Sequence, residues 1–88
     1  MKRVAVLGAS KNRSKFGNKA VRAYKMQGFE VFPINPREET IEGLECFSRV
    51  SGVKPDLDIV SVYVGPGILE GLLPEIASKG CHELWLYT

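Results

Sequence analysis

Residues Val4-Ala5-Val6-Leu7-Gly8-Ala9-Ser10 join four consecutive apolar side chains to three small ones. Four apolar residues in succession are typical of a strand that is buried on both faces of a parallel sheet. A small-residue turn after such a strand leads into a helix, whose first N–H groups lack partners and whose dipole favours an anion. This stretch therefore predicts a phosphate site where the first strand meets the first helix.

Charge is divided unevenly along the chain. Residues 1–29 carry eight Lys and Arg residues and no acid, whereas all ten acids follow, so the net charge of +2 hides two halves of opposite sign. This asymmetry indicates an anionic partner for the N-terminal half. Three of the cations have the spacing of an ordinary solvated helix face: Lys19, Arg22 and Lys25. The cations in the turn itself, where phosphate is expected, are Lys11, Arg13 and Lys15.

A chain of 88 residues has room for one domain with a small core, so residues 1–88 are expected to fold as a unit. Its 44% apolar and 25% charged residues are ordinary globular values and exclude disordered and fibrous classes. The apolar runs fall far short of the ~20 residues of a membrane span. Two distant cysteines and one histidine are too few for a zinc site, so Cys46 and Cys81 are expected to be reduced thiols of a cytoplasmic protein.

Apolar periodicity predicts strands over residues 4–7, 30–35, 44–47, 58–64 and 83–87. Pro33 removes one ladder donor from the second of them, so that strand should have an irregularity or an unpaired edge. Because helical segments separate the strands, their connections are crossovers and the sheet is mainly parallel. The expected fold class is α/β, with a Rossmann-like three-layer α/β/α arrangement.

Two helices are expected, one before the second predicted strand and one after the fourth. The first should have Asn18 as its N-cap and end at Gly28, where glycine permits left-handed backbone. The second should cover residues 68–78, with Pro74 inside the pattern as a source of a kink or of a delayed start. Residues 36–43 are expected to form a turn that includes a single helical turn.

In open parallel sheets the ligand lies beyond the carboxyl ends of the strands. Three segments should meet there: 8–10, 35–37 and 64–66. The first would cradle a pyrophosphate through N–H groups and the Ser10 hydroxyl, because Gly8 permits a sharp turn and Ala9 keeps bulk away. The last offers an apolar surface for an adenine ring. Tyr63 is near enough to stack on a ligand, although simple packing also explains it.

Motifs narrow the choice of nucleotide. The G-x-G-x-x-G fingerprint is absent, because Ser10 and Arg13 stand where its second and third glycines belong. The acidic residue that would hold a ribose diol is also missing, and Asn35-Pro36-Arg37 stands in its place. Arg37 suits a phosphorylated ribose through a charge-assisted hydrogen bond, which selects NADP or coenzyme A (CoA) over NAD.

A family resemblance is carried by five stretches: Val6-Leu7-Gly8-Ala9-Ser10, Phe16-Gly17-Asn18-Lys19-Ala20-Val21, Gly28-Phe29-Glu30-Val31-Phe32-Pro33-Ile34-Asn35-Pro36, Ile41-Glu42-Gly43-Leu44 and Val62-Tyr63-Val64-Gly65-Pro66. In this order they cover nearly the whole chain. They resemble the small CoA-binding proteins, whose single Rossmann-like domain is similar to the nucleotide-binding domain of the succinyl-CoA synthetase α subunit.

The resemblance implies a CoA site. In it, Ser10 and the neighbouring turn hold the pyrophosphate, residues 35–37 flank the ribose and its phosphate, and residues 64–66 line the adenine. The expected binding residues are Gly8, Ala9, Ser10, Lys11, Arg13, Lys15, Phe16, Gly17, Asn35, Pro36, Arg37, Val64, Gly65 and Pro66.

Members of that family generally continue with another helix and strand after the segment that corresponds to residues 83–87. This chain stops at Thr88, so we expect a bare sheet edge or face, which either invites a homodimer or is the mark of a shortened chain. The sequence contains no recognisable catalytic constellation, and its one histidine, His82, is expected at the surface. We therefore expect a module that binds CoA or acyl-CoA, that is not an enzyme, and that has no membrane partner.

Two alternatives stay open. The first is the NADP-binding domain of a reductase, or a fragment of one, which Arg37 would also suit. The second is a nucleic-acid binder that uses the cationic helix, with an affinity that falls steeply in salt. The acidic second half fits nucleic acid poorly, so we do not expect it as a partner.

Overall fold

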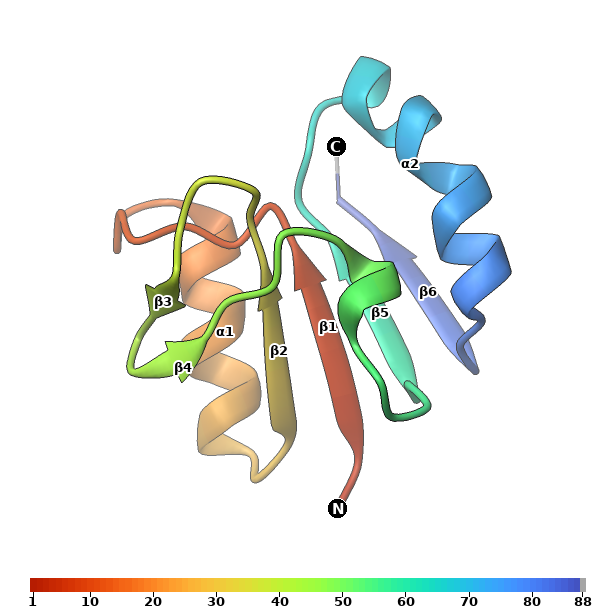
Figure 1. Ribbon diagram of the computed structural model, residues 1–88. Helices are drawn as coiled ribbons and strands as arrows, with labels where there is room; N and C mark the ends of the chain where they lie inside the picture. The colour runs from red at the N-terminus through yellow and green to blue at the C-terminus, as the bar shows by residue number, and fades with distance from the viewer. Residues whose placement is uncertain (88) are drawn as a thin grey trace.

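The computed structural model describes residues 1–87, which form a four-stranded parallel sheet with helices on both faces (Figure 1). The strand order is β2-β1-β5-β6. The bounds of these strands are Arg3–Leu7 for β1, Glu30–Ile34 for β2, Ile59–Val62 for β5 and Glu83–Leu86 for β6. The predicted Rossmann-like α/β fold, with a parallel sheet, is confirmed.

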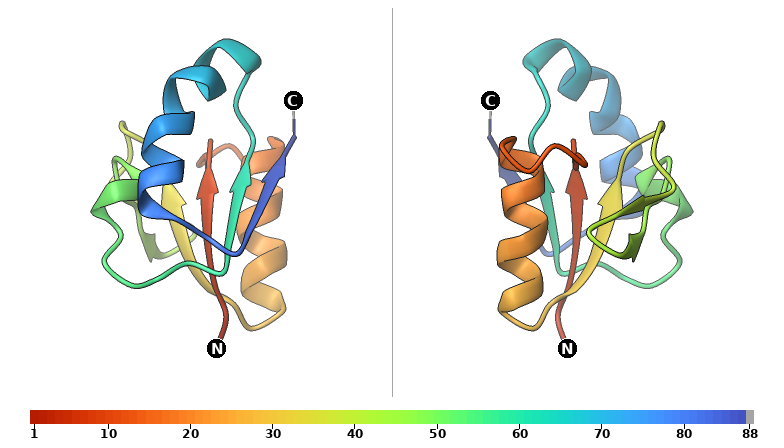
Figure 2. Two further views of the ribbon diagram at one scale, coloured as in Figure 1. Left: turned by 90° about the vertical axis from the view of Figure 1, so that its right-hand side faces the viewer. Right: turned by 90° about the vertical axis from the view of Figure 1, so that its left-hand side faces the viewer.

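The helices cover opposite faces of the sheet (Figure 2). α1 (Phe16–Met26) lies on one face, and α2 (Pro66–Lys79) lies on the other with the short 3-10 helix η1 (Val50–Gly52). Beside β2, a small antiparallel pair is formed by β3 (Thr40–Ile41) and β4 (Leu44–Glu45). The three-layer arrangement is therefore as predicted. Among the helices of residues 1–87, none is long and apolar enough to cross a membrane.

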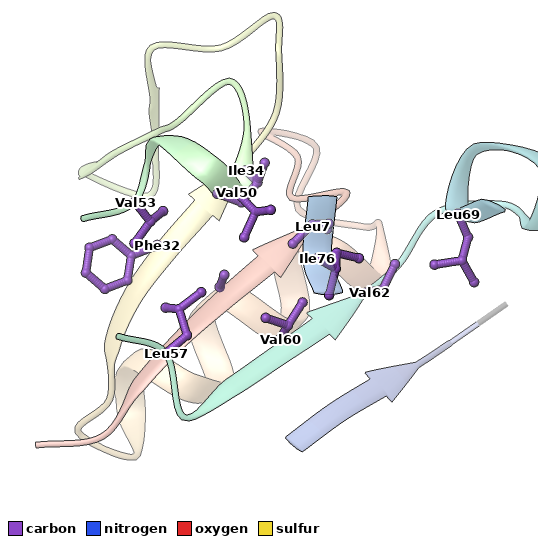
Figure 3. Close-up of a cluster of buried hydrophobic side chains, with 11 residues drawn as sticks. Leu7, Phe32, Ile34, Val50, Val53, Leu57, Val60, Val62, Leu69 and Ile76 are labelled. Carbon is purple, nitrogen blue, oxygen red and sulfur yellow. The ribbon is translucent and has the colours of Figure 1, made fainter. Parts of the chain in front are cut away.

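β1 is buried on both faces and contributes to two hydrophobic clusters. Val4 and Val6 pack into the cluster on the α1 side, where Val21 of the helix meets them. Ala5 and Leu7 pack into the cluster on the side of α2 and η1 (Figure 3). An unbroken apolar run suits this strand because alternate side chains enter opposite cores.

β2 forms one edge of the sheet, and this position explains why it tolerates Pro33. Pro33 lies opposite Val6, and its carbonyl oxygen accepts a hydrogen bond from the N–H of Phe47 at 2.8 Å. The carbonyl therefore faces the outer edge, and so does the nitrogen that lacks a hydrogen. Pro33 thus lies at a sheet edge, as predicted, but this edge is bridged by Phe47 and is not unpaired.

Asn18 is not the N-cap of α1. The helix begins at Phe16, and its N-cap is Lys15. Asn18 instead lies in the first turn of the helix and is wholly buried, with its side chain bonded to the carbonyl oxygen of Ser10 at 2.8 Å. A tertiary contact has therefore taken the side chain that would otherwise cap the helix start.

The single helical turn expected within residues 36–43 is also wrong. These residues form a turn and then β3, which pairs with β4 in a hairpin. Glu42 and Gly43 close the hairpin with positive φ angles of 52° and 77°. Such angles reverse the chain within two residues and are incompatible with a right-handed helical turn.

Some boundaries differ from those predicted. α2 begins earlier, at Pro66, because proline is favourable in the first turn of a helix, and it continues through Pro74. β5 ends at Val62, so the last residues of the predicted strand belong to the loop that borders the site. The strand predicted over residues 44–47 is reduced to β4 and a single bridge between Phe47 and β2.

Candidate functional site

Gly8 and Gly17 bring β1, α1 and the loop after β5 into direct backbone contact. Gly8 has a φ of 81°, and an added Cβ would lie 2.6 Å from the carbonyl oxygen of Tyr63. A Cβ on Gly17 would overlap the carbonyl oxygen of Gly8 and lie 2.9 Å from its carbonyl carbon. Neither position has room for a side chain, so the two glycines set how closely the helix approaches the turn.

The start of α1 offers unpaired backbone donors. No side chain of the described residues caps its first turn, and that turn contains no acidic residue. Within residues 1–87, the N–H groups of Phe16 and Gly17 have no acceptor. Together with the helix dipole, such groups favour an anion at this end of the helix.

The loop between β1 and α1 is shaped by its own side chains. The N–H of Asn12 donates to Ser10 Oγ at 3.0 Å, and the N–H of Ser14 donates to Asn12 Oδ1 at 3.0 Å. The hydroxyl of Ser14 donates to the same Oδ1 at 2.7 Å. Ser10 Oγ is thus an acceptor inside the loop, and its own O–H meets no acceptor among the described residues.

Asn35 connects the predicted site segment 35–37 to the segment 8–10. Its Nδ2 donates to the carbonyl oxygen of Ala9 at 2.8 Å, and its Oδ1 accepts the N–H of Arg37 at 2.8 Å. The second bond is an Asx turn, which fixes the backbone that carries Arg37. Pro36 and Arg37 are both exposed. The structure therefore brings these two segments together and leaves the guanidinium open to solvent.

The third predicted segment borders the first at Gly8. A Cβ on Gly8 would lie 2.9 Å from Val64 Cγ1. Gly65 is the N-cap of α2 and Pro66 is its first residue, and both are exposed. All three segments thus follow the carboxyl ends of β1, β2 and β5, which point to the same edge of the sheet (Figure 1).

A hollow of about 580 Å³ is lined by Phe16, Tyr63, Leu86 and Tyr87. Phe16 is 73% exposed, and the rings of Tyr63 and Tyr87 stack at a centroid distance of 4.8 Å. Leu86 and Tyr87 are lining residues that were not predicted from the sequence. Their place in the sequence could have indicated this role, because Leu86 and Tyr87 end the strand predicted over residues 83–87. Ligands of such sheets lie beyond the carboxyl ends of the strands.

The cations predicted for the turn differ in their partners. Lys11 Nζ lies 3.7 Å from Glu38 Oε1, and Arg13 Nε lies 3.4 Å from Glu42 Oε2. Lys15 is exposed and forms no ion pair with any residue that the structure describes. The loop is therefore electropositive but partly balanced by two carboxylates, one on the turn after β2 and one on the β3–β4 hairpin.

Within residues 1–87, no group of three or more His, Cys, Asp and Glu side chains is placed to hold a metal ion. His82 is exposed, as predicted, and its backbone N–H donates to the carbonyl oxygen of Asp58 at 3.1 Å. What this edge of the sheet can do is hold an anion through N–H groups and cations, with an apolar hollow beside it.

Comparisons with known proteins agree with this fold. The chain is similar to a conserved hypothetical protein of Pyrococcus furiosus, with 34% identity and a TM-score of 0.91 over 99% of this chain and 75% of that one. It is also similar to the dinucleotide-forming acetyl-coenzyme A synthetase 1 of Candidatus Korarchaeum cryptofilum. That match has 32% identity and a TM-score of 0.84, and it covers 91% of this chain and 18% of the synthetase.

A curated sequence relative is the ADP-forming acetate–CoA ligase of Methanocaldococcus jannaschii. The two are 33% identical over 87 residues, which are 99% of this chain but only 12% of the ligase. A family described as CoA binding domain matches residues 2–88. The resemblance stated from the sequence motifs is thereby confirmed. Because the match covers nearly its whole length, the chain belongs to the CoA binding domain family.

Proposed function

We propose that this chain is a non-catalytic module that binds CoA or acyl-CoA, with the pyrophosphate at the Gly8-Ala9-Ser10 turn and the start of α1. The observation that carries the proposal is the pair of unpaired N–H groups at Phe16 and Gly17 beside the cations of the turn. Membership of the CoA binding domain family supports the same ligand.

The other parts of the ligand each have a matching surface nearby. Arg37, exposed on its fixed turn, supplies a cation for the phosphate on the ribose. Residues 64–66 offer an apolar surface to the adenine ring. The hollow beside Phe16 and Tyr63 has room for the uncharged pantetheine arm of CoA, which is attached to the pyrophosphate. In this arrangement the anionic and apolar parts of CoA meet different elements of one sheet edge.

A module without chemistry of its own would act as a carrier, a sensor or the partner of an enzyme. The match to the acetate–CoA ligase supports the last role, because a segment of similar sequence is part of a much longer enzyme there. Cys46 and Cys81 are free and half-buried. Free thiols support the expected location in the reducing cytoplasm.

Arg37 also suits the 2′-phosphate of NADP, so the NADP-binding domain of a reductase is the second candidate. Calorimetric titration with CoA, acetyl-CoA, dephospho-CoA, NADP and NAD distinguishes the two. We expect CoA and acetyl-CoA to bind most tightly, dephospho-CoA to lose much of that affinity, and NAD to bind weakest. Tighter binding of NADP than of CoA would favour the second candidate, and binding of no nucleotide would reject both.

We also propose that two copies associate through β6, the second edge of the sheet. Leu84, Trp85 and Leu86 are 41%, 48% and 48% exposed. The N–H groups of Glu83 and Tyr87 bond to the β5 side, so those of Leu84 and Leu86 face outward. An apolar edge with unpaired donors is a template for another strand, and a second copy supplies one of the same shape.

Replacing Leu84 with lysine is expected to shift the chain towards the monomer, because a charge at a sheet edge opposes strand pairing. Sedimentation equilibrium over a range of protein concentrations gives the mass. Ser78→Lys is the matched control, since it adds the same charge at an exposed position on α2 and should associate like the wild type. A monomeric wild type, or equal association of both variants, would contradict the proposal.

A further inference from the structure

The turn between β3 and β4 contains a residue in an unfavourable conformation. Glu42 has a φ of 52°, and Gly43 follows it with a φ of 77°. Glycine, asparagine and aspartate are the usual residues in such two-residue hairpin turns, because other side chains rarely adopt a positive φ. A strained residue of this kind suggests that its side chain has a function, because the strain must be offset by other contacts.

The side chain of Glu42 reaches the start of α1. Its Oε2 accepts a hydrogen bond from Asn18 Nδ2 at 3.1 Å and lies 3.4 Å from Arg13 Nε. The hydrogen bond from Asn18 lowers the pKa of Glu42, and the positive charge of Arg13 adds to the effect. The carbonyl oxygen of Glu42 accepts a bond from Lys25 Nζ at 2.9 Å, which ties the turn itself to the helix.

Asn18 connects Glu42 to the loop after β1. Asn18 Nδ2 also donates to the carbonyl oxygen of Ser10 at 2.8 Å, and Oδ1 accepts a bond from Arg22 Nε at 2.7 Å. Arg22 in turn donates through Nη2 to the carbonyl oxygen of Arg13 at 2.9 Å. Two carbonyl oxygens of the loop are thus engaged by α1, which keeps these acceptors from facing an anion.

We propose that Glu42 is a positioning residue for the anion site: its carboxylate fixes Asn18 and Arg13, and these hold the loop in the shape that presents its donors. The inference rests on the proposed function and extends it to a residue outside the three site segments. A loop ordered before binding loses less conformational freedom when the ligand arrives. The strain at position 42 is then the cost of placing a carboxylate between the hairpin and the helix.

A competing role for Glu42 predicts the opposite effect of its removal on the affinity for CoA. If Glu42 only balanced the charge of Arg13, it would compete with the phosphates of the ligand, and its removal would tighten binding. Glu45 allows the two roles to be separated. It lies in the same hairpin, is exposed, and has no ion pair with any described residue. Glu45→Gln therefore removes the same charge without touching the loop.

Calorimetric titration with CoA compares three variants. Glu42→Gly removes the carboxylate while suiting the positive φ, and we expect it to bind CoA about tenfold more weakly, the lower end of the range for the loss of one hydrogen bond to a charged group. Glu42→Gln keeps an oxygen acceptor for Asn18 but loses the ion pair with Arg13, so its affinity for CoA should lie between those of Glu42→Gly and Glu45→Gln. Urea unfolding establishes that each variant is folded.

Hydrogen exchange adds a measurement that needs no ligand. In Glu42→Gly, the amide protons of residues 10–15 should exchange faster than in the wild type and in Glu45→Gln, while those of β1 stay unchanged. Unchanged exchange in the loop, or tighter CoA binding by Glu42→Gly, would overturn the positioning role. If the wild type does not bind CoA, the proposed function fails, and the exchange result still decides the role of Glu42.

Discussion

Replacing Gly17 with alanine is expected to separate α1 from the turn after β1 and to abolish CoA binding. The added methyl group would overlap the carbonyl oxygen of Gly8, which is backbone and cannot rotate away. Overpacking of this kind costs about 1 to 3 kcal/mol of folding free energy, and a contact with backbone belongs at the upper end of that range. The N–H groups at the helix start would also leave the place where we expect the pyrophosphate.

Urea unfolding measures the stability of the Gly17→Ala variant, and calorimetry measures its affinity for CoA. Gly71→Ala is the matched control, because a Cβ at Gly71, in α2, meets no atom within 4 Å. The free energy of unfolding of that control should rise by roughly 0.5 to 1 kcal/mol, since alanine is the better helix former. If Gly17→Ala were as stable as the wild type and bound CoA equally well, the close approach of helix and turn would have no importance for the site.

The second large effect is expected for Arg37→Ala. If Arg37 binds the phosphate on the ribose of CoA, its loss should weaken CoA binding by about 1.5 to 3 kcal/mol, the range for a hydrogen bond to a charged group. That loss corresponds to roughly tenfold to 150-fold in the dissociation constant. Binding of dephospho-CoA, which lacks this phosphate, should be nearly unchanged. Calorimetric titration of both ligands into both proteins provides the four affinities.

Ser10→Ala is the contrasting variant for the same titrations. Ser10 lies in the turn where the pyrophosphate is expected, and its Oγ also accepts the N–H of Asn12. Its replacement should therefore weaken CoA and dephospho-CoA alike, because both ligands carry the pyrophosphate. Equal losses of the two ligands in Arg37→Ala would refute the assignment of Arg37 to the ribose phosphate.

The part of the site formed by β1 and its turn could be predicted from the sequence, because its signals are local. The apolar run, Gly8 and the cations of the turn are adjacent in the chain. The meeting of this turn with Asn35 and Val64 also follows from topology, since parallel strands end at one edge of the sheet. Which of these residues touch the ligand stays a prediction.

Asn18 and the β3–β4 hairpin could not be predicted in the same way. An asparagine near a helix start is typical of an N-cap, and only its contacts with Ser10 and Glu42 identify it as a buried connector. The hairpin was missed because Glu42-Gly43 is not one of the usual turn pairs, and its strain is offset by side-chain contacts with α1. Both depend on residues that are distant in the chain.

The central place of β1 has a consequence for synthesis on the ribosome. Val4 pairs with Val31 on one side and with Ile59 on the other, so β1 is translated before both of the strands that flank it. Until β5 has been translated, one edge of β1 has no partner strand, a state in which nascent chains aggregate or engage chaperones. The strand at the centre of the folded core is thus one whose pairing partners are translated only later.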